Sequence, residues 1–149
     1  MKNKLLVSIF AVLLPFSAVA SDGVISVPSK YSVEKTADRF ENTIKERGMT
    51  LFARIDHGNN AKKVNLTLRP TEVIIFGNPR VGTPMMQCSQ QVAIDLPQKA
   101  LIWQDDAGKV WFSYNDPEYL MKRHNMKGCE EVIKRVSTIL NGLSKAATT

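Results

Sequence analysis

Two apolar segments, residues 99–104 and 109–114, flank the short polar run Asp105-Asp106-Ala107-Gly108. Glycine readily adopts the left-handed backbone of a tight turn, so we predict two antiparallel strands joined as a β-hairpin. If the loop consists of its last three residues, Trp103 lies opposite Trp111. Because successive side chains of a strand point to opposite faces, this register fixes which residues the fold must bury.

The two faces of the predicted hairpin differ in character. One face carries only apolar and aromatic side chains and is predicted to be core: Ala100, Ile102, Val110, Phe112 and Tyr114. The other presents Leu101, Trp103 and Trp111 among polar residues, which is more apolar surface than a solvated sheet face usually shows. We therefore expect an interface at Leu101, Trp103 and Trp111, occupied by a second copy of the chain or by a ligand.

Two amphipathic helices are expected to cover the core face. The first follows Ser32, a good N-cap, and ends at Gly48, with an apolar stripe at every third or fourth residue. The last runs from about Cys129 to Leu143 and leaves residues 144–149 as a loose tail.

Further strands and short helices lie between these two helices. Residues 49–55 alternate as a strand that a turn at 57–60 closes, and residues 73–76 form an apolar run interpreted as a strand buried on both faces. Thr83-Pro84 and Asp116-Pro117 each combine a capping residue with a proline and predict short helices. The order indicates one compact α+β domain of two layers, with helices on one face of a mostly antiparallel sheet.

The N-terminus is typical of a secretory signal peptide. Lys2 and Lys4 precede an apolar run over residues 5–14, and Ala18-Val19-Ala20 forms a small-residue cleavage site. We expect cleavage between Ala20 and Ser21, a domain over residues 21–149, and a periplasmic or secreted protein. The apolar run is shorter than the ~20 residues of a spanning helix, so no membrane anchor is expected after cleavage.

Charge distribution argues against a nucleic-acid partner. The chain has a formal net charge of +6, but its basic residues are interspersed with acidic ones, as on an ordinary solvated helix face. No basic block is interleaved with aromatic residues. The expected partner is an unidentified small molecule or protein.

Polar residues at predicted strand ends are candidates for ligand binding. The corners around Gly77-Asn78-Pro79, Asp95-Leu96-Pro97 and Asn115-Asp116-Pro117 contain turn-forming residues, and such corners often line sites. If they converge, the ligand-binding residues are Asn78, Arg80, Asp95, Tyr114 and Asn115. The alternative is that each corner only performs turn and cap chemistry.

An enzymatic alternative uses titratable residues near the same corners. A small hydrolase or isomerase could employ Asp95, Tyr114 or Asp116 with His57 as acid and base. A lone histidine beside a Gly-Asn-Asn sequence is more often an exposed turn residue. No nucleophile elbow, phosphate loop or dinucleotide fingerprint is present.

The two cysteines, Cys88 and Cys129, are predicted to form a disulfide, because free thiols are a liability in an oxidising compartment. A second alternative uses them otherwise. Cys129 at a helix N-terminus could be a reactive thiol, and both cysteines with Met85, Met86 and His124 form a soft set suited to copper. We expect no cofactor and no metal.

Several ordered motifs carry a resemblance to a known family. The segments Asp56-His57, Leu68-Arg69-Pro70-Thr71, Ile75-Phe76-Gly77-Asn78-Pro79, Gly82-Thr83-Pro84-Met85-Met86, Ile94-Asp95-Leu96-Pro97 and Tyr114-Asn115-Asp116-Pro117 resemble those of domain of unknown function 302. The resemblance covers about residues 31–143. It implies a compact α+β fold, often seen as a homodimer, and leaves the function open. Members that lack the cysteine pair show that a role for these thiols cannot be taken from the family.

The function predicted from the sequence is therefore that of an exported ligand-binding or protein-interaction module. An enzyme would need titratable groups that converge in one concave pocket, whereas a binding module needs only an apolar surface or groove.

Overall fold

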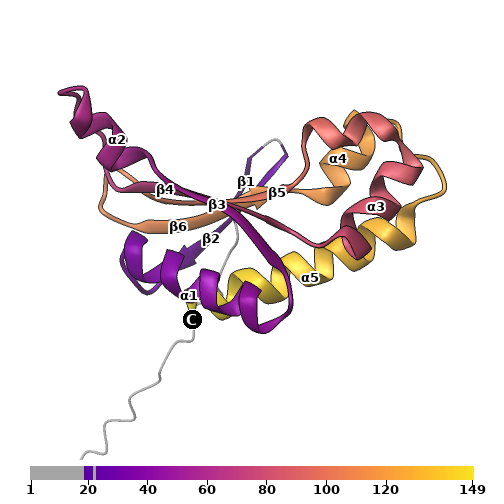
Figure 1. The fold of residues 1–149 in the computed structure, drawn as a ribbon, viewed down its shortest axis with the longest axis horizontal. Helices are drawn as coiled ribbons and strands as arrows, with labels where there is room; N and C mark the ends of the chain where they lie inside the picture. Colours follow the sequence, from indigo (N-terminus) through magenta and orange to yellow (C-terminus); the bar gives the residue numbers. More distant parts are fainter. Residues whose placement is uncertain (1–18, 22) are drawn as a thin grey trace, which may run out of the picture.

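The computed structural model describes residues 19–21 and 23–149 and shows an antiparallel six-stranded sheet (Figure 1). The strand order is β1-β2-β6-β5-β4-β3. The strands are β1 (Val19–Ser21), β2 (Val24–Ser29), β3 (Thr50–Asp56), β4 (Thr71–Gly77), β5 (Gln98–Gln104) and β6 (Val110–Asn115).

The predicted leader falls mainly outside the described residues. Residues 1–18 are not described, and β1 contains the predicted cleavage bond between Ala20 and Ser21. Cleavage there would leave only Ser21 of this edge strand, and the cleavage itself stays a prediction. None of the helices in the described part of the chain has the length and apolar character needed to cross a membrane.

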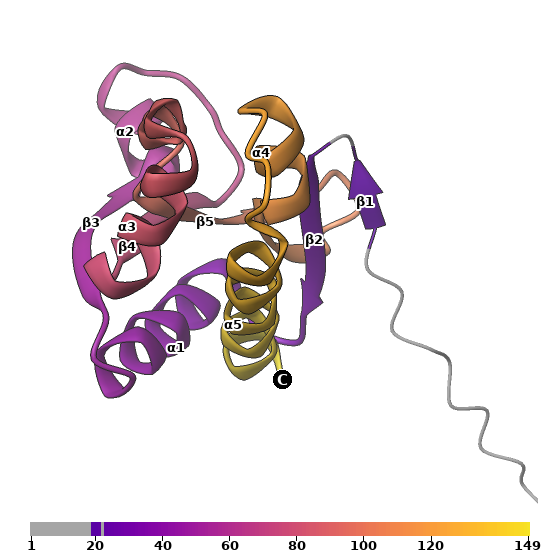
Figure 2. The same ribbon diagram turned by 90° about the vertical axis from the view of Figure 1, so that its right-hand side faces the viewer.

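The main helices, α1 (Val33–Glu46) and α5 (Glu130–Thr148), pack on one face of the sheet (Figure 1). In Figure 2, α5 lies between α1 and β2. The shorter helices are α2 (His57–Lys63), α3 (Pro79–Cys88), the 3-10 helix η1 (Gln90–Ile94) and α4 (Pro117–Arg123). The predicted α+β class and its two layers are confirmed.

The core lies between these helices and the sheet, and aromatic rings occupy its centre. Phe40 of α1 is fully buried and meets Phe76 of β4 and Phe112 of β6 edge to face, with ring centroids 4.9 and 4.8 Å apart. Such contacts add to the stability gained from buried apolar area. Ser32 caps α1 by accepting a hydrogen bond from the Lys35 amide, as expected from the sequence.

The predicted hairpin register is confirmed. Trp103 pairs with Trp111 and Ile102 pairs with Phe112 across β5 and β6. The face predicted to be core is buried at all five positions. Asp105 orders the connecting turn, because its carboxylate accepts hydrogen bonds from the amides of Ala107 and Lys109.

Three local predictions were wrong. Strand β4 is not buried on both faces, since buried and half-buried residues alternate along it. The predicted turn at 57–60 is the start of helix α2, which Asp56 caps through the amide of Asn59. Helix α3 begins at Pro79 rather than at Pro84, because Asn78 supplies its N-cap.

The loose tail predicted for residues 144–149 is also wrong. Helix α5 continues to Thr148, and Ala147 and Thr148 are fully buried. The Arg39 side chain of α1 donates to the carbonyl oxygens of Ala146 and Ala147 at 2.9 and 3.1 Å. The Lys30 amide donates to the carbonyl oxygen of Thr148 at 3.1 Å. The end of the chain is therefore an integral part of the helical layer.

The sheet face opposite α1 and α5, called the outer face below, is largely apolar. It is formed by half-buried or exposed side chains of β3 to β6: Ala53, Ile55, Val73, Ile75, Leu101, Trp103 and Trp111. Both indole N–H groups are satisfied within the chain, since Trp103 donates to the Ser113 hydroxyl and Trp111 to the Asp105 carboxylate. The hydrogen bond from Trp111 is the largest influence that lowers the pKa of Asp105.

Candidate functional site

A cavity of about 280 Å³ lies where the end of β4 and the start of β5 meet α3 and α5. No charged side chain is among the described residues that form its wall. The lining residues are Met49, Phe52, Phe76, Gly77, Asn78, Pro79, Val81, Gly82, Thr83, Met85, Met86, Ala93, Leu96, Pro97, Gln98, Val136, Ile139 and Leu140. Phe52 is 55% exposed, so the cavity borders solvent at this side chain.

The first wall forms because the chain turns sharply from β4 into α3. The Asn78 side chain accepts a hydrogen bond from the Arg80 amide at 2.9 Å and donates to the carbonyl oxygen of Gly48. Pro79 then occupies the first helical position, where its missing N–H has no helical partner to lose. A Cβ on Gly77 would lie 3.5 Å from the Phe52 ring, so the strand end passes close beneath that ring.

The second wall is the corner between η1 and β5, which contains a cis Leu96–Pro97 bond. Lys99 donates to the carbonyl oxygens of Asp95 and Pro97 at 3.2 and 3.0 Å. The Asp95 carboxylate binds Arg123 at 3.2 Å and His124 at 2.5 Å, both at the end of α4. These contacts fix Leu96 and Pro97 against the cavity.

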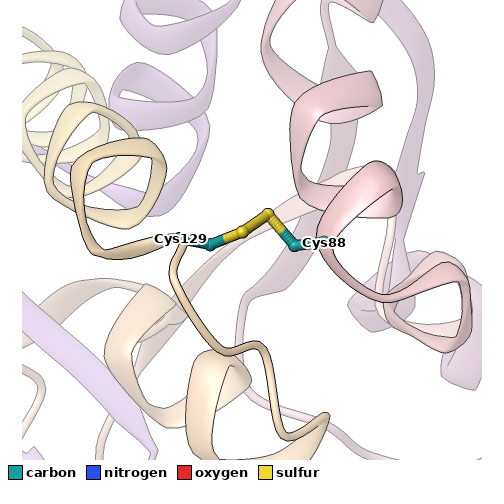
Figure 3. The surroundings of a disulfide bond; sticks show 2 residues. All are labelled: Cys88 and Cys129. Atoms are coloured by element: carbon teal, nitrogen blue, oxygen red, sulfur yellow. A yellow bond between two sulfur atoms is a disulfide. The ribbon is translucent and has the colours of Figure 1, made fainter.

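A disulfide between Cys88 and Cys129 joins the two helices on either side of the cavity, and its presence confirms the predicted pairing. Cys88 is the last residue of α3 and Cys129 is the N-cap of α5 (Figure 3). Their Cα atoms lie 6.3 Å apart, within the usual range for a disulfide. The bond therefore limits how far the α3 and α5 walls can separate.

Gln98 is the unusual polar residue of the wall. It is the first residue of β5, pairs with Phe76, and is only 8% exposed. Both polar atoms of its side-chain amide are inaccessible to solvent and have no hydrogen-bond partner among the residues that the structure describes. Buried amides are almost always paired, because an unpaired one loses its hydration without compensation.

Of the five predicted ligand-binding residues, Asn78 alone is among the described residues that line the cavity. Asn78 lies in the cavity wall and also caps α3, so the cap interpretation holds for it as well. Asp95 holds the second corner from outside the wall, and Arg80 is exposed. Tyr114 and Asn115 lie on β6 and do not line the cavity.

The predicted base, His57, lies at the opposite end of the sheet from Asp95, Tyr114 and Asp116. His57 is exposed at the start of α2, and Asp116 caps α4 by accepting from the Glu118 amide. Tyr114 is in the core, where burial raises the pKa of its phenol. The histidine beside Asp95 is His124 rather than His57.

The copper or free-thiol alternative requires sulfur atoms that the structure joins to each other in a disulfide. In the described part of the chain, no three His, Cys, Asp or Glu residues form a group able to hold a metal ion. Met85 and Met86 instead contribute to the apolar wall of the cavity.

Sequence reasoning missed Met49, Phe52 and Gln98 and the α5 residues of the wall. The last three, Val136, Ile139 and Leu140, belong to the stripe that the sequence assigned to core packing. A glutamine on the core-facing side of β5 was a signal for Gln98, because it shares its face with the apolar residues Ala100 and Ile102.

The fold and the cavity define a small α+β domain with a largely apolar pocket that opens to solvent beside Phe52. The chain belongs to the family described as domain of unknown function DUF302, whose model matches residues 25–143. A crystal structure of an uncharacterised conserved DUF302 protein from Bacillus stearothermophilus has the same fold, with a TM-score of 0.75 and 16% identity. The match covers 85% of this chain and 99% of the other.

Two proteins of Brucella are similar in sequence as well. The fluoride-specific ion channel FluC 1 of Brucella suis biovar 1 is 42% identical over 134 residues, which is 89% of this chain and 53% of that protein. The fluoride-specific ion channel FluC 2 of Brucella melitensis biotype 1 is 42% identical over the same share of this chain and 50% of its own length. The chain thus spans about half the length of the curated relatives it matches.

Proposed function

We propose that the chain is an exported module that binds a small, uncharged and largely apolar molecule in the cavity between α3, α5 and the sheet. The observation that carries this proposal is the absence of charged side chains from the whole described wall. A charged ligand would lose its hydration there without a counter-charge, whereas an apolar ligand gains from leaving water.

The structural elements that form the wall support the same proposal. Helices, a strand start and a strand end each contribute to it, and hydrogen bonds of Asn78 and Asp95 hold its two corners. Three methionines, Met49, Met85 and Met86, line it, and their flexible side chains adapt to ligands of different shape. A partly preformed apolar pocket is the usual form of a small-molecule site.

The proposal is tested by filling the cavity from Gly82. A Cβ at Gly82 would lie 3.9 Å from its nearest neighbour, Leu96, so alanine fits without strain. Gly82→Leu extends further and is expected to reduce binding of a neutral probe such as 2-nonanone at least tenfold, while Gly82→Ala retains most of it. Methyl NMR of labelled methionines during titration measures the binding.

The methionines provide an internal control. Met49, Met85 and Met86 should shift on titration, whereas Met126, which is buried outside the lining, should not. Equal shifts at Met126, or binding by Gly82→Leu as tight as by the wild type, would place the ligand elsewhere and refute the proposal.

As a second function, we propose that the outer face binds protein, beginning with a second copy of the chain. The specific observation is the row of seven apolar side chains across four strands, with Leu101 at 36% exposure. The relatives named fluoride-specific ion channels support the proposal that this chain has a second protein partner. Because this chain matches about half of each, we propose that it acts beside a membrane channel of that class.

Replacing both tryptophans tests this surface. Trp103→Ala with Trp111→Ala is expected to weaken self-association about a hundredfold or more, because buried tryptophans contribute strongly to interfaces. Light scattering over a concentration series measures it, and co-purification with a fluoride channel tests the second partner.

Val64→Ala with Leu66→Ala is the matched control. These two apolar side chains are 64% and 65% exposed in the segment between α2 and β4, outside the outer face. The control variant should associate like the wild type. If the wild type is monomeric at every concentration and no channel co-purifies, the surface has no such function.

A further inference from the structure

The unpaired amide of Gln98 narrows the chemical class of the ligand, on the assumption that the proposed function holds. Its Oε1 can accept and its Nε2 can donate, and neither group has a partner within the described part of the chain. The neighbouring polar side chain, Asn78, already donates to Gly48 and accepts from Arg80. Among the buried residues described in the wall, Gln98 thus has unused hydrogen-bonding capacity in both directions.

The backbone fixes where Gln98 can find a partner. It lies on the core-facing side of β5 beside Phe76, and it forms part of the cavity wall. Its amide atoms are themselves inaccessible, so a molecule seated in the cavity meets them once the side chain turns toward the void. A change between staggered side-chain rotamers costs less than leaving a buried amide unpaired.

We infer that the ligand is a neutral molecule with an apolar body and one carboxamide or lactam group, and that Gln98 recognises this group. A planar amide offers one acceptor and one donor side by side and can pair with Gln98 through both. A ketone offers only an acceptor and leaves the Gln98 oxygen unpaired. A carboxylate matches neither the acceptor of Gln98 nor the uncharged wall.

The volume of the cavity limits the size of the ligand's apolar body. At about 30 Å³ for each water-sized unit, a 280 Å³ cavity holds roughly ten non-hydrogen atoms. Octanamide, 2-nonanone and octanoate each have about this size, so they separate head-group chemistry from hydrocarbon volume.

The experiment compares these three probes on the wild type and on Gln98→Leu by calorimetry and methionine-methyl NMR. The wild type should bind octanamide about tenfold tighter than 2-nonanone, and octanoate most weakly. In Gln98→Leu the preference for the amide should disappear while 2-nonanone still binds. The variant should be at least as stable as the wild type, because it removes an unpaired buried amide.

Gln87→Leu is the matched control, since Gln87 is an exposed residue of α3 outside the lining. It should keep the preference for octanamide. Equal affinity of the wild type for octanamide and 2-nonanone, or an amide preference that survives in Gln98→Leu, would overturn this inference but not the proposed function. Failure of all three probes to shift Met49, Met85 and Met86 would overturn both.

Discussion

Removing the disulfide by Cys88→Ala with Cys129→Ala is expected to lower the free energy of unfolding by about 4 kcal/mol. The bond links residues 41 positions apart, so its loss frees a long loop in the unfolded chain. For a domain of this size the melting temperature should fall by roughly 15 °C. Urea denaturation and calorimetry measure the two quantities.

The same variant should also weaken binding of apolar probes, because the disulfide joins α3 and α5, which form opposite walls of the cavity. A reductant should reproduce both effects in the wild type and have none on the double variant. Alkylation of both cysteines in the untreated native protein, or an unchanged melting temperature after reduction, would show that the bond does not stabilise the fold.

Sequence patterns predicted the elements whose signals are local. The hairpin of β5 and β6 was predicted to the correct register because one glycine-containing turn and strict alternation allow few other pairings. The cap at Ser32 and the apolar stripe through Phe40 likewise depend on neighbouring residues only. The structure of each of these features depends on residues that are close together in the sequence.

The cavity was not predictable in the same way. Its walls come from segments that are far apart in sequence, such as Met49 and Leu140, and the stripe on α5 has the same pattern whether it packs on a sheet or lines a void. The polar corners lie at one end of the neighbouring strands β4, β5 and β6, but their side chains do not line one shared pocket. Asn78 caps α3, and Asp95 binds the end of α4, which are local contacts. Only tertiary packing distinguishes these cases.

Residues 144–149 were predicted to be loose because the apolar stripe of the last helix ends at Leu143. In the structure, Arg39 and Lys30 supply partners that the local sequence does not reveal.

Deleting residues 144–149 is therefore expected to destabilise the protein by about 3 to 5 kcal/mol. The deletion removes the buried side chains of Ser144, Ala147 and Thr148 and the carbonyl acceptors for Arg39 and Lys30. Each lost hydrogen bond and each uncovered methyl group contributes about 1 kcal/mol. Urea denaturation of the truncated and full chains measures the difference.

A point substitution separates packing from the mere loss of residues. Ala147→Asp places a carboxylate in a fully buried position and should destabilise the protein by about 3 kcal/mol or more, because the charge has no partner there. Lys145→Asp is the matched control on the exposed side of the same helix and should cost less than about 1 kcal/mol. If the truncation and Ala147→Asp both leave the urea midpoint unchanged, the end of the chain is the loose tail that its composition indicates.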